Sequence, residues 1–103
     1  MIYVVASSEL KPGCREKFIE IAKANIPNVL AEDGCIFYTL NGDYDSGLAA
    51  QGALNENVLT FVECWESMEH LKAHLQAPHM KVFVENVKDL RAGSSLKILS
   101  PVC

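Results

Sequence analysis

The stretch VLTFVECWESMEHLKAHLQAPHMKVF, residues 58–83, decides the fold, because its hydrophobic period changes in the middle. Residues 58–66 are rich in β-branched and aromatic side chains with period-two alternation, which predicts a strand. Ser67 is a good N-cap for a short helix over residues 68–76. Pro78 suits the first turn of a second helix, over residues 78–91. The stretch therefore predicts a strand followed by a helix in two pieces.

The rest of the chain extends this pattern on both sides. Asp33-Gly34 suits the end of a helix, with Gly34 in the left-handed conformation, and Gly93 is expected to end the last helix. We expect strands at residues 2–11, 35–44 and 95–102, a long helix at residues 13–31 and a loop at residues 45–57. The order β-α-β-β-α-β in one domain, residues 1–103, predicts an α+β fold of the ferredoxin-like type with an antiparallel sheet.

The alternation in the third strand also predicts the assembly. Leu59, Phe61, Glu63 and Trp65 would face the helices, which leaves Val58, Thr60, Val62 and Cys64 on the opposite face of the sheet. That face is semi-apolar, and a monomer would expose it to water. We therefore expect a homodimer in which a second sheet covers this face.

Composition and charge exclude several classes of partner. The chain of 103 residues has 9 basic and 13 acidic residues, a net charge of −4, and no basic cluster. Nucleic acids and anionic membranes both require concentrated positive charge, so we expect neither as a partner. No run approaches the length of a membrane span and no signal peptide is visible, which predicts a cytoplasmic protein.

The histidines downstream of the third strand are the candidate chemical groups. A glutamate between two aromatic residues is expensive to bury unless something pairs with it. His70, His74 and His79 are the nearest candidate partners of Glu63, although a structural partner such as the backbone or a tyrosine would also satisfy it. His74 and His79 flank the break at Ala77-Pro78, where a concave polar spot is expected, although one could merely cap the break.

The sequence gives less support to a metal site or to a reactive cysteine. His70 and His74 share a helix face, but no third ligand follows at a suitable spacing, so we expect no metal site. The four cysteines form neither a C-x-x-C motif nor a zinc pattern. We expect Cys14, Cys35 and Cys64 to be reduced structural residues and Cys103 to be a free thiol.

A histidine base beside aromatic walls is suited to an acidic aromatic substrate. Removing a phenolic or enolic proton near neutral pH calls for a base such as imidazole, and a neighbouring Glu63 would hold its tautomer. Tyr38, Phe61 and Trp65 could form flat walls for a planar substrate, or they could be ordinary core.

The residues around this stretch resemble a known family. Its pattern is a Glu-x-Trp motif, a short helix and then His-x-x-x-Pro-His ahead of an aromatic helix, and the matching residues are Glu63, Trp65, His74, Pro78, His79 and Phe83. This pattern resembles the signature of the antibiotic biosynthesis monooxygenase family. The Lys11-Pro12-Gly13 turn, Pro27, the run Glu32-Asp33-Gly34-Cys35 and Tyr38 resemble its bacterial quinol monooxygenase subgroup.

The resemblance implies a ferredoxin-like homodimer with a shared α/β-barrel that oxygenates quinols or polyphenols with O2. It implies no flavin, haem or metal, a catalytic group of His74, His79 and Glu63, and substrate contacts from Trp65, Tyr38, Phe61 and Phe83. Haem-degrading members carry an Asn on the first strand and a His on the last helix, where this chain has Ala6 or Ser7 and Val84. Aromatic-polyketide oxygenases carry an Asn at the position of Phe61.

Two other functions stay open. A small-molecule isomerase of the same fold, of the kind that processes a signalling sugar phosphate, would use the same His and Glu residues on a polar substrate. A Lys or Arg inside the pocket would favour a phosphate, whereas an apolar pocket would favour a quinol. A non-catalytic dimeric binding module would show a filled core in place of the pocket.

Overall fold

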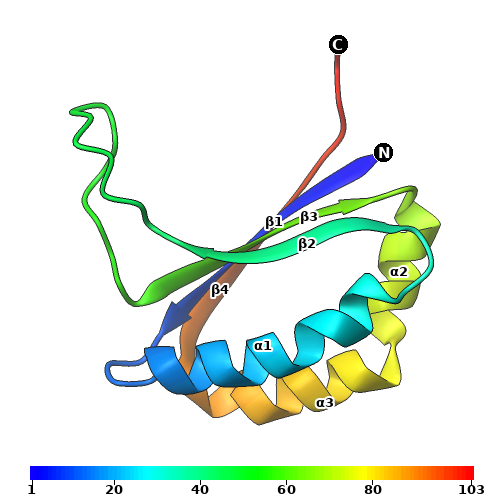
Figure 1. The fold of residues 1–103 in the computed structure, drawn as a ribbon, viewed down its shortest axis with the longest axis horizontal. Helices are drawn as coiled ribbons and strands as arrows, with labels where there is room; N and C mark the ends of the chain where they lie inside the picture. Colours follow the sequence, from blue (N-terminus) through cyan, green and yellow to red (C-terminus); the bar gives the residue numbers. More distant parts are fainter.

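A computed structural model describes residues 1–103 and has four strands and three α-helices (Figure 1). The predicted element order is confirmed, with the second helix divided into two pieces. The elements are β1 (Ile2–Leu10), α1 (Arg15–Leu30), β2 (Cys35–Gly42), β3 (Val58–Trp65), α2 (Met68–Gln76), α3 (Pro78–Val87), a 3₁₀ turn (Lys88–Leu90) and β4 (Arg91–Leu99).

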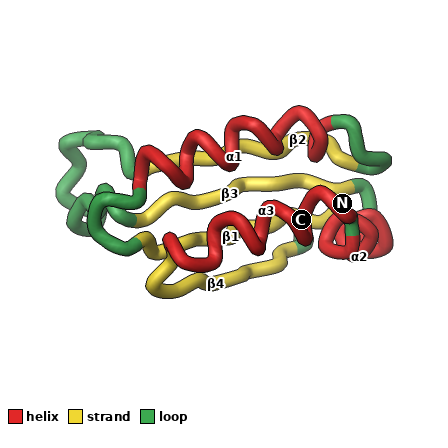
Figure 2. Tube along the Cα trace, turned by 90° about the horizontal axis from the view of Figure 1, so that it is seen from below, coloured by secondary structure: helices red, strands yellow, loops and turns green.

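The sheet is antiparallel, with the strand order β2-β3-β1-β4, and the helices lie on one face of it (Figure 2). This is the ferredoxin-like arrangement that the sequence predicted. In the register of the two central strands, Val4 lies opposite Glu63 and Ser8 lies opposite Leu59. These pairs fix which side chains share a level beneath the helices.

The start of the last strand was predicted wrongly. We expected a helix to residue 91 and a strand from residue 95, but α3 ends at Val87 and β4 begins at Arg91. Gly93 does not end a helix; it lies within the strand, opposite Glu9, and a register irregularity follows between Glu9 and Leu10. A glycine is compatible with this edge strand, because β-bulges are common at sheet edges and some of them contain a glycine.

The core lies between the sheet and the helices. Leu59, Phe61, Glu63 and Trp65 are all buried, as their alternation predicted. Cys64 is also buried, although it lies on the outer face of the sheet. Its two strand neighbours are Tyr3 and Phe37, whose ring centroids lie 6.4 Å apart, and its thiol contacts the Met1 sulfur at 3.6 Å.

The outer face of the sheet has a mixed character. Val58, Thr60 and Val62 are partly exposed there, and the Ser7 and Thr60 hydroxyls form a hydrogen bond of 2.9 Å across β1 and β3. Dimerisation through this face stays a prediction. None of the four cysteines forms a disulfide, and Cys103 is exposed. No helix has the combination of length and apolar character that a membrane crossing requires.

Candidate active site

A cavity of about 380 Å³ lies between the sheet and the two short helices. Most of its wall is apolar, and it comprises Val4, Ala6, Tyr38, Phe61, Leu71, Leu75, Met80, Phe83, Val84 and Leu96. The polar part of the wall comprises Ser7, Ser8, Glu63, His74, Arg91, Ser94 and Ser95. A largely apolar cavity with a few convergent polar groups is the usual form of a small-molecule site.

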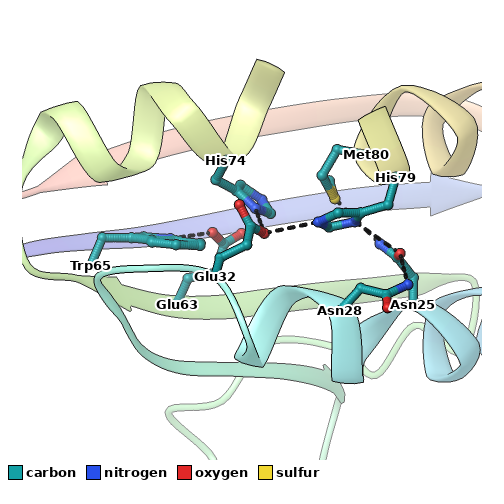
Figure 3. Close-up of polar contacts among 8 residues, drawn as sticks. All are labelled: Asn25, Asn28, Glu32, Glu63, Trp65, His74, His79 and Met80. Atoms are coloured by element: carbon teal, nitrogen blue, oxygen red, sulfur yellow. Dashed lines mark hydrogen bonds and ion pairs between the residues drawn. The ribbon is translucent and has the colours of Figure 1, made fainter. Parts of the chain in front are cut away.

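His74 is the histidine that reaches this cavity. It lies on α2 and is only 1% exposed. Its Nδ1 lies 2.7 Å from a Glu32 carboxylate oxygen (Figure 3). Its ring also packs against Trp65, with centroids 4.6 Å apart, and meets Tyr38 edge-on at 5.6 Å. Because Glu32 occupies Nδ1, Nε2 is the nitrogen that remains for a ligand.

Glu32 is the partner that the sequence did not identify. It follows α1, and its amide N–H donates to the Val29 carbonyl at 3.0 Å. Gly34, two residues further on, has φ +80° and turns the chain. The Glu32 carboxylate then contacts His74, which lies 42 positions further along the chain. The motif around Glu32 was visible as part of the family resemblance, but nothing in it indicated a contact with His74.

His79 approaches the same carboxylate from the other side. Its Nε2 lies 3.2 Å from the Glu32 oxygen that contacts His74, without hydrogen-bond geometry. Its Nδ1 forms a hydrogen bond of 3.0 Å with the Asn25 side-chain oxygen. His79 lines a separate groove between α1 and α3 rather than the cavity. The two histidines are therefore joined through Glu32 (Figure 3), but they line different spaces.

Glu63 is buried and lines the cavity, but its hydrogen-bond partner is not a histidine. It accepts a hydrogen bond of 2.9 Å from the Trp65 indole N–H. Burial raises the pKa of the Glu63 carboxyl, while the Trp65 hydrogen bond and His74 act against this rise and Glu32 adds to it. The predicted role of holding the imidazole tautomer therefore belongs to Glu32, because Glu63 is engaged by the indole.

Three of the four aromatic residues that were predicted to contact the substrate line the cavity. Tyr38 and Phe61 lie with ring centroids 5.1 Å apart, and Phe83 meets Phe61 edge-on at 6.1 Å. Trp65 does not line it: its side chain is completely buried. Its indole supports His74 and Glu63 from behind and offers no face to a ligand. Burial raises the pKa of Tyr38 well above its ordinary range, so its phenol stays protonated.

Arg91 was not predicted as a site residue. It enters the cavity from the first position of β4, and its guanidinium carbon lies 5.9 Å above the Phe18 ring. Burial lowers its pKa, and the phenol of Tyr38 acts in the opposite direction. The sequence placed this residue at the end of a helix, so nothing pointed to the cavity.

His70 has a local structural role. Its Nδ1 lies 2.6 Å from the Ser67 hydroxyl, and its Nε2 lies 3.4 Å from an Asp33 oxygen. Gly34 lies against its ring, since a Cβ at that glycine would stand 2.2 Å from the His70 Cγ. No three His, Cys, Asp or Glu side chains come together in an arrangement that could hold a metal ion.

The fold and the signature residues define a class of protein. Residues 1–86 match the model of the antibiotic biosynthesis monooxygenase family, and the chain belongs to this family. It is 35% identical over 103 residues to the probable quinol monooxygenase YgiN of Escherichia coli K12, which covers 98% of each chain. Its fold is similar to that of Rv0793 from Mycobacterium tuberculosis, with a TM-score of 0.82, 24% identity and coverage of 99% and 95% of the two chains.

A second solved structure, "Putative antibiotic biosynthesis monooxygenase from Nitrosomonas europaea", supports the same fold. It superimposes with a TM-score of 0.85 at 16% identity over the full length of both chains. At such identity the likeness concerns the fold alone. The family and YgiN support a function of the monooxygenase type.

Proposed function

We propose that this protein oxidises or oxygenates a quinol-like aromatic molecule with O2, using His74 as the base. The observation that carries the proposal is the buried His74 imidazole, which is held by Glu32 at Nδ1 and lines an aromatic cavity. A quinol has its own reducing electrons, so the protein needs to supply a base, orientation and a dry pocket. The relative YgiN, named as a probable quinol monooxygenase, supports the same substrate class.

In the proposed reaction, His74 Nε2 takes a phenolic proton from the bound quinol. Imidazole is suited to this task because its ordinary pKa lies near neutral pH. Glu32 holds the ring through Nδ1 and stabilises the imidazolium that forms, as a carboxylate beside a histidine base does. Glu32 is therefore a positioning residue. His79 shares the Glu32 carboxylate and connects it to the groove between α1 and α3.

The electron-rich quinol anion then reduces O2. One electron passes to O2 to give a semiquinone and superoxide. If the two radicals combine, the resulting peroxide loses water, and quinol plus O2 become hydroxyquinone plus water. If a second electron and proton are transferred instead, the products are quinone and hydrogen peroxide. Tyr38, as a protonated phenol in the cavity wall, can donate a hydrogen bond to a substrate oxygen.

Two further parts of the proposal concern cofactors and assembly. We propose that the reaction needs no flavin, haem or metal and that O2 is the co-substrate. We also propose that the active form is a homodimer built through the outer sheet face, where Tyr3, Val5 and Val62 are partly exposed apolar residues.

A second candidate is an isomerase acting on a small phosphorylated molecule, which Arg91 in the cavity wall favours. The cavity itself argues against a binding module with a filled core.

The test is O2 consumption by metal-stripped protein with a panel of reduced naphthoquinones. We expect O2 uptake with at least one member, and incorporation of ¹⁸O from ¹⁸O2 separates a hydroxyquinone product from a simple quinone. Hydrogen peroxide formed in equal amount to quinone would indicate an oxidase. Activity that appears only after a metal or flavin is added would contradict the cofactor-free part. No uptake above the uncatalysed rate with any quinol would contradict the proposal as a whole.

A further inference from the structure

The guanidinium of Arg91 occupies an unusual place. It belongs to one of only two arginines in the chain, and it projects into the cavity instead of into solvent. The guanidinium carbon lies 5.9 Å from the centroid of the Phe18 ring, and this ring covers one face of the planar guanidinium. The Phe18 ring in turn contacts Phe61 and Phe83, which also line the cavity, at centroid distances of 6.3 and 6.0 Å.

This cation has no anionic partner within the chain. Its Nε is buried without a hydrogen-bond partner, and none of the four ion pairs of the structure involves Arg91. Arginine stays charged in proteins, and a charge removed from water is normally paired. An unpaired guanidinium in the wall of a ligand cavity therefore points to an anion that arrives with the ligand.

The surroundings of Arg91 suit an anionic group. Ser8 and Ser94 are direct partners across β1 and β4, and both line the same cavity. Their hydroxyls can donate hydrogen bonds to an oxygen atom. No lysine lines the cavity, so Arg91 is its sole permanent cation. The planar Arg91 guanidinium and the nearby hydroxyl donors together suit a carboxylate, because a guanidinium binds a carboxylate through two parallel hydrogen bonds.

The cavity also extends along β1, from the level of Val4 to that of Ser8. Glu63, beside His74, lies at the level of Val4 in the sheet, whereas the serine pair lies at the level of Ser8. Four strand residues span about 13 Å at roughly 3.3 Å per residue. Tyr38 lies opposite Glu63 on β2, at the same end as His74, and its ring is 5.6 Å from that of His74. A ligand that reaches both ends needs an elongated aromatic body.

We propose that Arg91 binds a carboxylate of the substrate, which is a bicyclic aromatic acid with its phenolic oxygen directed to His74. The proposal rests on the proposed function for the role of His74, but it makes a separate claim about binding. Arg91 is thus a specificity-determining residue.

The test is calorimetric binding of three related compounds that are not quinols. 6-Hydroxy-2-naphthoate has a phenol and a carboxylate at opposite ends, 2-naphthol lacks the carboxylate, and 6-hydroxy-2-naphthyl phosphate keeps the phenol but has a phosphate in place of the carboxylate. We expect the unaltered protein to prefer the hydroxynaphthoate over naphthol by about 10- to 100-fold, the contribution of hydrogen bonds to charged groups. Arg91→Gln should reduce this ratio to near one, and Arg91→Lys should retain part of it.

Arg15→Gln is the matched control, because it removes the same charge from the other arginine, which lies outside the cavity. It should leave the ratio unchanged. A ratio near one in the unaltered protein, or a ratio that survives Arg91→Gln, would overturn the proposal. Tighter binding of the naphthyl phosphate would replace the carboxylate with a phosphate and favour the isomerase. If Arg91→Gln fails to fold, the unaltered protein and Arg91→Lys decide the matter.

Because no turnover is measured, the two proposals can fail separately. Selective binding of the carboxylate without any O2 uptake would leave Arg91 in its role and remove the quinol chemistry. O2 uptake with uncharged quinols and no preference for a carboxylate would support the quinol chemistry and remove the proposed role of Arg91.

Discussion

Glu32→Gln tests the connection between the carboxylate and the proposed base. The substitution keeps the size of the side chain but removes the charge that lies 2.7 Å from His74 Nδ1 and 3.2 Å from His79 Nε2. An amide can also present its NH₂ group to Nδ1, which would favour the wrong tautomer. The imidazolium formed during proton transfer would then lack its counter-charge.

The expected loss can be worked out from this geometry. General-base catalysis contributes roughly 10²–10⁴-fold. Because Glu32 acts through His74, its removal should lower kcat by a smaller factor, on the order of 10- to 100-fold. KM should change little, because Glu32 does not line the cavity. Loss of a charged hydrogen bond should destabilise the fold by about 1.5–3 kcal/mol, which lowers Tm by roughly 4–8 °C per kcal/mol in a domain of this size.

The assay is steady-state O2 uptake with the best reduced naphthoquinone, together with thermal melting. Asp33→Asn is the matched control: it removes the same charge from the next residue, whose carboxylate is 96% exposed and lies 3.4 Å from His70. Such surface pairs contribute little, so kcat and Tm should stay close to those of the unaltered protein. Equal turnover in the two variants, or an effect of Glu32→Gln on KM alone, would refute the reasoning.

Three other predictions concern stability and assembly. Burial raises the pKa of Glu63 above its unfolded value, so its contribution to stability is greatest below the unfolded pKa and is lost as pH rises through the folded pKa. Glu63→Gln should remove this loss, so the Tm of the variant should change less with pH across that range than the Tm of the unaltered protein. The same dependence of Tm on pH in both proteins would count against this effect of Glu63. Gly34→Ala should lower stability by at least about 2 kcal/mol in chemical unfolding, since φ is +80° and the new Cβ would meet His70; a change below about 0.5 kcal/mol would be inconsistent with this turn. Sedimentation should show a homodimer, and Val62→Lys, which places a charge on the outer sheet face, should weaken it; a monodisperse monomer of 11.3 kDa would disprove the predicted interface.

The sequence predicted the elements because their signals are local. Alternation in residues 58–66 placed Leu59 and Phe61 in the core, and Ser67 and Pro78 marked the starts of the two short helices, as observed. The start of β4 was missed because Gly93 resembled a helix end, whereas cross-strand pairing with β1 keeps it in the sheet.

The site was less predictable because its contacts join distant parts of the chain. His74 and Glu32 are separated by 42 residues, and only the packing of α2 against the turn that follows α1 brings them together. Glu63 was the nearer candidate along the chain, but the Trp65 indole, two residues away on the same strand face, forms its hydrogen bond. Arg91 was predicted to lie at the end of a helix, whereas it begins β4 and lines the cavity.

The most direct measurement of the central claim is quinol turnover by His74→Asn compared with His79→Asn. Both variants replace an imidazole that contacts Glu32, but only His74 lines the cavity. Because His74 is buried, its variant should also melt at a lower temperature, so turnover is measured well below both transitions and expressed per folded molecule. We predict that His74→Asn loses at least about 100-fold in kcat and that His79→Asn loses far less. Turnover by folded His74→Asn within about threefold of the unaltered protein would contradict the assignment of His74 as the base.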